Sequence, residues 1–143
     1  MNLENFTIKS QESLLNAQRF AEKSNHTEFL PEHLLYTILI SEENIVSDII
    51  KKIGIEKRKI ISDLELQLKS FPQAQYSHQT IVSPRLQKVI NFALDIMTQL
   101  KDEYVSVEHL FIGIFDENGP AGKILQKYGL TKNIILETLK TVR

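Results

Sequence analysis

The tripeptide Glu-His-Leu occurs twice in this chain of 143 residues, at positions 32–34 and 108–110. A separation of 76 residues is too long for a solenoid period and indicates one helical unit duplicated within a small domain. Other positions match at a separation of 76, or of 75 after a one-residue deletion: Thr7 and Ser83, Gln11 and Gln87, Ala17 and Ala93, Gly54 and Gly129, Lys57 and Lys132, Ile60 and Ile135, and Leu64 and Leu139. This agreement predicts two repeats, at about 1–70 and 83–143, joined by a connector at 71–82.

The composition favours an all-α fold and argues against several classes of function. Only five glycines and four prolines interrupt the chain, and alternating β-branched residues are rare. The net charge is −1, with 17 basic and 18 acidic residues interspersed, so no basic face predicts nucleic-acid binding. No apolar run approaches the roughly 20 residues that span a bilayer, and no signal peptide is recognisable. The absence of cysteine excludes disulfides and agrees with a cytoplasmic location.

Eight helices are predicted, four in each repeat of a single domain that spans residues 1–143. Thr7, Ser106 and Thr131 are typical N-caps, while Gly54 and Gly129 are typical terminators. Prolines at positions 31, 84 and 120 suit the first turn of a helix. The predicted helices span residues 8–23, 31–42, 45–53, 56–69, 84–101, 107–116, 120–128 and 132–142. The two four-helix repeats are expected to be related by a pseudo-two-fold axis.

Helical spacing predicts the core-facing residues of the two longest helices. The first helix is expected to bury Ile8, Leu14, Ala17 and Ala21, and the fifth to bury Leu86, Val89, Ile90, Ala93, Met97 and Leu100. Phe92 and Ile96 form a further apolar stripe, matched in the first repeat by Asn16 and Phe20. This stripe either packs against the first repeat or lines an exposed groove for extended apolar peptide.

Three segments of the chain, residues 5–12, 81–89 and 102–110, resemble the N-terminal domain of Clp-type AAA+ unfoldases, above all the ClpB-like disaggregases. The resemblance implies a Clp N-terminal fold and a non-catalytic module, monomeric by itself, on a homohexameric parent. It also implies that unfolded or aggregated client proteins, or adaptor proteins, are the partners. ATP and Mg²⁺ are expected only in the parent's motor domains, because the phosphate-binding motif Gly-x-x-x-x-Gly-Lys-Ser/Thr is absent here.

The same resemblance implies where clients bind. The expected substrate-binding residues are Thr7, Phe92, Ile96, Asp102, Glu108, His109 and Leu110. ClpC-like relatives suggest an alternative, an adaptor-docking or phosphoarginine-binding site formed by Thr7, Glu32, Ser83 and Glu108. The two glutamates also have a simpler explanation, because the helix dipole stabilises a carboxylate in the first turn by about 0.3–1 kcal/mol.

The sequence predicts neither a catalytic residue nor a metal site. His33 and His109 each follow a glutamate, but Thr37 and Gly113 occupy the i+4 positions where a zinc-binding helix carries its second histidine. An enzyme would need a deep pocket with clustered titratable groups. A further alternative is a purely structural cap on the ring, which would bind no client at all.

Overall fold

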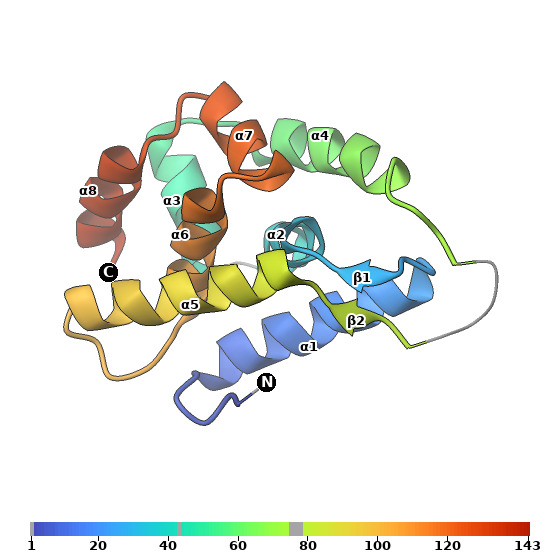
Figure 1. Cartoon of the computed structure of the whole chain (residues 1–143). Helices are drawn as coiled ribbons and strands as arrows, with labels where there is room; N and C mark the ends of the chain where they lie inside the picture. Colours follow the sequence, from blue (N-terminus) through green and yellow to red (C-terminus); the bar gives the residue numbers. More distant parts are fainter. Residues whose placement is uncertain (1, 43, 75–78) are drawn as a thin grey trace.

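The chain folds into eight helices and two short strands, so the predicted all-α fold is confirmed (Figure 1). The computed structural model describes residues 2–42, 44–74 and 79–143. In these residues the elements are α1 (Ile8–Lys23), β1 (Glu28–Phe29), α2 (Pro31–Ile40), α3 (Ile45–Ile53), α4 (Lys57–Lys69), β2 (Ile81–Val82), α5 (Pro84–Gln99), α6 (Val107–Glu117), α7 (Pro120–Lys127) and α8 (Lys132–Val142). Each repeat therefore contributes four helices.

Local signals set most helix boundaries. The side chains of Thr7 and Ser83 each accept a hydrogen bond from the backbone N–H three residues later, at 3.1 and 3.0 Å. Gly54 and Gly129 follow α3 and α7 with φ values of 95° and 90°, a left-handed conformation that glycine adopts without strain. Thr7, Thr131 and the two glycines therefore act as predicted, whereas the Ser106 side chain makes no capping bond to the backbone and lies 2.9 Å from Nδ1 of His109.

Two helices end earlier than the sequence predicts. α2 ends at Ile40 because Ser41 has an extended backbone, with ψ at 160°. α5 ends at Gln99, and Lys101 takes a left-handed φ of 60°. Asn25, which lies 76 residues before Lys101, has a φ of 58° in the turn after α1. The duplication has kept this left-handed turn although neither copy contains glycine there.

The two repeats are interlocked by two equivalent backbone pairings. β1 and β2 pair in parallel, with Phe29 opposite Val82. Phe6 forms a parallel bridge with Val105, and Phe6 and Phe29 lie 76 positions before Val82 and Val105. The segment before each repeat's first helix therefore pairs with the other repeat (Figure 1). β2 lies at the end of the predicted connector, whose residues 75–78 lie outside the described residues.

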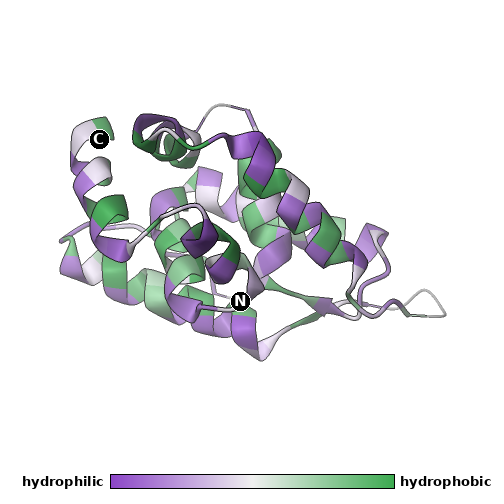
Figure 2. Ribbon diagram, turned by 90° about the horizontal axis from the view of Figure 1, so that it is seen from above, coloured by the Kyte–Doolittle hydropathy of each residue, from purple (hydrophilic) through white to green (hydrophobic). Residues whose placement is uncertain are grey.

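α2 and α6 lie at the centre of the core. Eight residues of each are buried, which covers all sides of these short helices. The surrounding helices carry both hydrophilic and hydrophobic residues (Figure 2). α4 packs against α7 and α3 against α8, which are equivalent contacts between the repeats. Among the helices described, none combines the length and the hydrophobicity that a membrane crossing needs.

Two predicted core positions require correction. Ile8 is 74% exposed at the start of α1 instead of buried. In α5, Ile96 is only 2% exposed and continues the buried stripe after Ala93, whereas Met97 is half-buried. Both the i+3 and the i+4 positions can continue a helical stripe, so spacing alone does not choose between them. Internal packing is therefore the correct interpretation for Ile96.

The histidines of the repeated tripeptide fix the starts of α2 and α6. Nδ1 of His33 accepts a hydrogen bond from the N–H of Leu30, and Nδ1 of His109 accepts one from the N–H of Ser106, both at 2.9 Å. A glutamate or glutamine usually makes this contact from the third helical position. Because Nδ1 is an acceptor, the proton of each neutral ring lies on Nε2.

The partners of these two Nε2 atoms differ between the repeats. Nε2 of His33 lies 2.7 Å from Nδ1 of His26, whereas Nε2 of His109 lies 2.7 Å from Oδ2 of Asp102. Positions 26 and 102 are equivalent, since they are 76 residues apart. Burial, together with the charge that His26 would carry, lowers the pKa of His33 to about 3, and burial also lowers the pKa of His26. Both rings of the first repeat are therefore neutral at pH 7.

A buried ion cluster joins α2 to α5, α6 and α7. Arg85 donates hydrogen bonds to both carboxylate oxygens of the fully buried Glu32, at 3.1 and 2.8 Å. Arg85 also donates two bonds of 2.9 Å to Glu117, and the N–H of Ala121 donates to Glu32 at 2.9 Å. The bonds to Glu117 and Glu32 outweigh burial and raise the pKa of Arg85. The desolvation penalty of the buried Glu32 carboxylate is offset only while these partners remain.

We predict that His33 makes the domain sensitive to acid. Above pH ~6.5 this residue is neutral in the folded and the unfolded chain, so it does not affect the free energy of unfolding. Below that pH the unfolded chain binds a proton that the folded chain excludes until about pH 3, so stability falls as the pH falls. The loss between pH 7 and pH 5 should be about 2 kcal/mol.

Urea unfolding at pH 7 and pH 5 measures this loss. The matched variant is His33→Gln, which keeps an acceptor for the Leu30 N–H but has no group that titrates in this range. Its stability should fall less than that of the wild type over the same interval. Equal losses in the two proteins would show that His33 is not the acid-sensitive group.

We predict that Arg85→Met lowers the free energy of unfolding by about 3 kcal/mol, because it leaves the carboxylate of Glu32 buried and uncompensated. The control is Lys132→Met, which breaks the ion pair between Lys132 and Asp116. Because the Lys132 side chain is 41% exposed, this loss should cost less than about 1 kcal/mol. Urea unfolding at pH 7 measures both. Similar losses in the two variants would contradict the structural role of Arg85.

Candidate functional site

The starts of three helices meet at one open surface depression. The N-caps Thr7 of α1, Asn44 of α3 and Ser106 of α6 all border it. Its volume is about 360 Å³, and its lining residues are Thr7, Ile8, Lys9, Asn44, Ile45, Ser106, Val107 and Glu108. We call this depression the groove. It combines aliphatic side chains with the polar ends of helices, as peptide-binding surfaces do.

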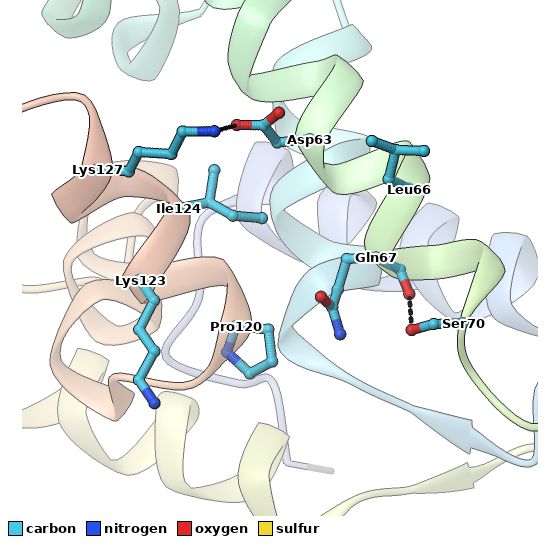
Figure 3. Close-up of a pocket in the computed structure, with 8 residues that line it drawn as sticks. All are labelled: Asp63, Leu66, Gln67, Ser70, Pro120, Lys123, Ile124 and Lys127. Carbon is cyan, nitrogen blue, oxygen red and sulfur yellow. Dashed lines mark hydrogen bonds and ion pairs between the residues drawn. The ribbon is translucent and has the colours of Figure 1, made fainter.

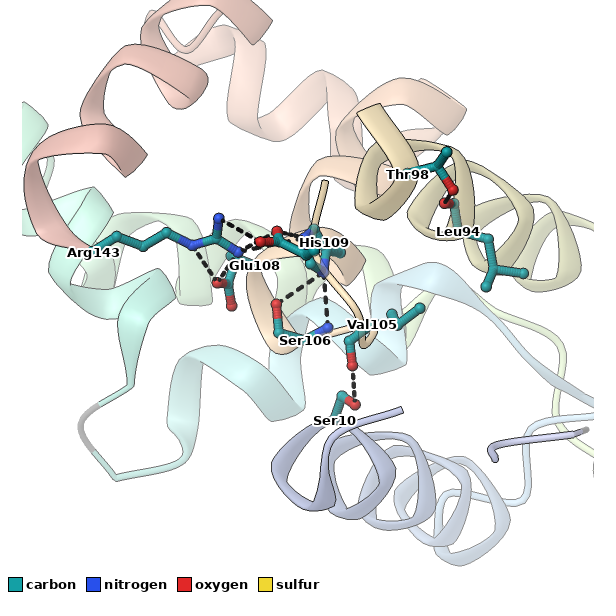
Figure 4. A network of polar contacts seen from close by, with 9 residues as sticks. Ser10, Leu94, Thr98, Val105, Ser106, Glu108, His109 and Arg143 are labelled. Carbon is teal, nitrogen blue, oxygen red and sulfur yellow. Dashed lines mark hydrogen bonds and ion pairs between the residues drawn. The ribbon is translucent and has the colours of Figure 1, made fainter. Parts of the chain in front are cut away.

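Glu108 supplies the carboxylate of the groove, and Arg143 holds it in place (Figure 4). Arg143 donates from Nε and Nη2 to Oε2 of Glu108 at 3.1 and 3.0 Å, and from Nη1 and Nη2 to Asp102 at 3.2 and 2.6 Å. Burial alone would raise the pKa of Asp102, but the bonds from Arg143 and His109 outweigh it and lower the pKa. No described residue donates to Oε1 of Glu108, so this oxygen can accept a hydrogen bond from a ligand.

The surface that is equivalent to the groove surrounds Glu32 and is closed by Arg85. This residue occupies the position that matches Lys9, and its guanidinium spans Glu32 and Glu117. A Cβ added to Gly119 would overlap that guanidinium, so the space above the glycine is filled. Lys9 is exposed and forms no ion pair with any described residue, which leaves the groove open.

The structure brings together part of each predicted set of binding residues. Thr7 and Glu108 both line the groove, and Asp102 is linked to Glu108 through Arg143. Glu32 and Ser83, which complete the anion-binding alternative, are 0% and 1% exposed and lie at the surface that Arg85 closes.

Most of the residues predicted to line an apolar groove are buried, so this part of the prediction is wrong. Ile96, His109 and Leu110 are at most 2% exposed, because α5 and α6 pack against each other along this face. Phe92 is half-buried on α5, with Nζ of Lys88 at 5.8 Å from its ring centre, and it does not line the groove. The apolar residues that do line it are Ile8, Ile45 and Val107. Each of these directly follows an N-cap, which is the sequence signal that could have identified them.

A larger depression, of about 560 Å³, lies between α4 and α7 (Figure 3). Leu66 and Ile124 contribute its apolar part. Lys127 and the hydroxyl of Tyr128 both donate to Asp63, at 3.0 and 2.6 Å, so these polar groups satisfy one another. Within the described ranges, no three histidine, aspartate or glutamate side chains are placed to hold a metal ion.

Comparisons with known proteins agree with this architecture. The chain is 34% identical to the chaperone protein ClpB of Nitratidesulfovibrio vulgaris and 30% identical to that of Clostridium perfringens, with the whole chain aligned in both cases. It spans only 17% of the length of these curated relatives. It is therefore similar to one domain of much longer chaperones.

Solved structures show the same fold at lower sequence identity. The Hsp104 N-terminal domain from Candida albicans superimposes with a TM-score of 0.83 at 19% identity, over 94% of this chain and 89% of that one. A ClpV N-domain in complex with a VipB peptide gives a TM-score of 0.76 at 15% identity, over 99% and 91% of the two chains. The family model of the Clp repeat (R) N-terminal domain matches residues 5–128. The chain thus belongs to the Clp repeat N-terminal domain family.

Proposed function

We propose that this domain binds extended segments of unfolded or aggregated polypeptide in the groove and performs no catalysis itself. The observation that carries the proposal is the composition of the groove, in which the exposed Ile8 and the half-buried Ile45 adjoin a carboxylate with one oxygen to which no described residue donates. Ile8 is 74% exposed although it belongs to a well-packed helix, and exposed apolar surface of this kind is typical of binding sites. The aliphatic residues would take apolar side chains, while the helix starts would bind the polypeptide backbone.

The parent of this domain would be a ClpB-like, ATP-dependent disaggregase or unfoldase, with its nucleotide and Mg²⁺ in hexameric motor domains. The similarity to ClpB chaperones supports this proposal. The ClpV N-domain was solved with a peptide, which supports polypeptide as the ligand class. Weak binding by each domain would suffice, because several domains on one ring raise the effective concentration of sites.

A ClpC-like adaptor-docking or phosphoarginine-binding role is the second candidate. It would use Thr7 and Glu108 at the groove, and Ser83 and Glu32 at the equivalent surface that Arg85 closes. At the first of these surfaces the open groove is compatible with such a ligand. At the second, an incoming group would have to displace Arg85 from two carboxylates, so we rank this function lower.

An NMR titration with a reduced and alkylated, permanently unfolded protein tests the proposal. We expect saturable shifts at Thr7, Ile8, Ser106 and Val107. Ile8→Ser should weaken binding about tenfold, because it removes roughly two methylene equivalents of buried apolar surface. Leu15→Ser is the matched control, since Leu15 is 48% exposed on the same helix but does not line the groove.

Two results would reject polypeptide binding at the groove. The first is the absence of saturable shifts there, and the second is equal weakening by Ile8→Ser and Leu15→Ser. A parallel titration with free phosphoarginine distinguishes the second candidate. If phosphoarginine shifts Thr7 and Glu108 while the unfolded protein does not, the anion-docking function replaces the proposed one.

A further inference from the structure

The first repeat contains a separate cavity that shares no lining residue with the groove. Its volume is about 400 Å³, within the range of small-ligand sites. It lies where α1 and α4 end, beside α2, and its lining residues are Phe20, Ser24, His26, Tyr36, Glu65, Leu68, Lys69 and Gln73. We call it the aromatic cavity.

His26 presents a hydrogen-bond donor at this cavity. The Leu30 N–H donates to Nδ1 of His33, so the proton of His33 lies on Nε2 and is donated to Nδ1 of His26. The proton of the neutral His26 ring must then lie on its Nε2, for which no described residue provides an acceptor. His26 is 4% exposed, and no fully sealed side-chain atom among the described residues lacks a partner. This N–H is therefore not sealed off, and it belongs to a residue that lines the cavity.

The wall next to this donor is aromatic. The rings of Phe20 and Tyr36 are stacked with their centres 5.0 Å apart and an angle of 19° between their planes. Leu68 adds apolar surface, and the two charged lining residues, Glu65 and Lys69, are of opposite sign. Such a site favours a ligand with an aromatic ring and an uncharged hydrogen-bond acceptor, rather than an ion.

At the equivalent place in the second repeat, an arginine side chain lies where the first repeat has its cavity. Asp102 occupies the position of His26, and Arg143, which matches Leu68 at a separation of 75, donates two hydrogen bonds to it. Ile96 takes the position of Phe20. In the second repeat a guanidinium thus pairs with the residue at the position of His26, whereas in the first repeat the cavity adjoins a donor that no described residue pairs.

We propose that the aromatic cavity is a second binding site, which takes one aromatic residue of an extended polypeptide. The aromatic side chain packs on Phe20 and Tyr36, and a backbone carbonyl of the same segment accepts the Nε2–H of His26. The site extends the proposed function, because a polypeptide held in the groove gains a second contact. The affinity of the aromatic cavity for a small aromatic compound does not depend on the groove.

An NMR titration with N-acetyl-L-phenylalaninamide tests this site, with N-acetyl-L-alaninamide as the control that has the same backbone groups. We expect saturable shifts of the ring signals of Phe20 and Tyr36 and of the Nε2 signal of His26 with the aromatic compound alone. Equal shifts with both compounds, or no saturable shift, would overturn the proposal.

Variants that copy the second repeat sharpen the test. His26→Asp combined with Leu68→Arg replaces the donor and adds a guanidinium, and should weaken binding of the aromatic compound at least tenfold. Tyr36→Leu removes only the aromatic wall and should weaken it about fivefold, which keeps the test valid if the double variant does not fold. Unchanged affinity in a folded variant would overturn the proposal.

The groove provides the matched control for these variants. Binding of the unfolded protein at Thr7 and Ser106 should persist in Tyr36→Leu, and binding of the aromatic compound at Tyr36 should persist in Ile8→Ser. The proposals for the groove and for the aromatic cavity can therefore be disproved separately. If Ile8→Ser abolishes the shifts at Tyr36, the cavity is no independent site and the proposal is wrong.

Discussion

The pairing of two arginine side chains with buried carboxylates determines how the two repeats of this domain differ. A carboxylate removed from water is stable only when cations and hydrogen-bond donors compensate its charge. Arg85 does this for Glu32, and it thereby joins α2, α5 and α6 and fills the surface above Gly119. Arg143 compensates Glu108 from outside the groove, and no described residue donates to the second carboxylate oxygen.

The duplication gives two pairs of equivalent places where a ligand could bind, and an arginine of the second repeat occupies one place in each pair. Arg85 closes the helix-start surface around Glu32, and Arg143 lies beside Asp102 at the place that is equivalent to the aromatic cavity. The groove and the aromatic cavity remain open. Gene duplication followed by a few substitutions, Lys9 against Arg85 and Leu68 against Arg143, therefore produces two unlike surfaces from one backbone plan.

The sequence predicted the features that depend on neighbouring residues. Thr7, Ser83 and Gly54 mark helix ends because capping acts within one turn, and the duplication supported each assignment. The groove was harder to predict because it joins residues from α1, α3 and α6. Arg85 and Glu32 are 53 residues apart, and no periodicity relates them. The closure of the surface around Glu32 could therefore not be foreseen. The assignment of Ile96 to a surface failed because its i+3 spacing from Ala93 suits burial equally well.

Paramagnetic relaxation enhancement from a spin-labelled unfolded polypeptide tests the inequality of the two helix-start surfaces most directly, because one spectrum reports both. The amide signals at the starts of α1, α3 and α6, around Thr7, Ile45 and Ser106, should broaden strongly. The amide signals at the equivalent starts of α5, α7 and α2, around Ser83 and Gly119, should stay sharp, since Arg85 fills that surface. Equal broadening of the two sets would contradict the conclusion that the arginine positions decide which surface binds polypeptide.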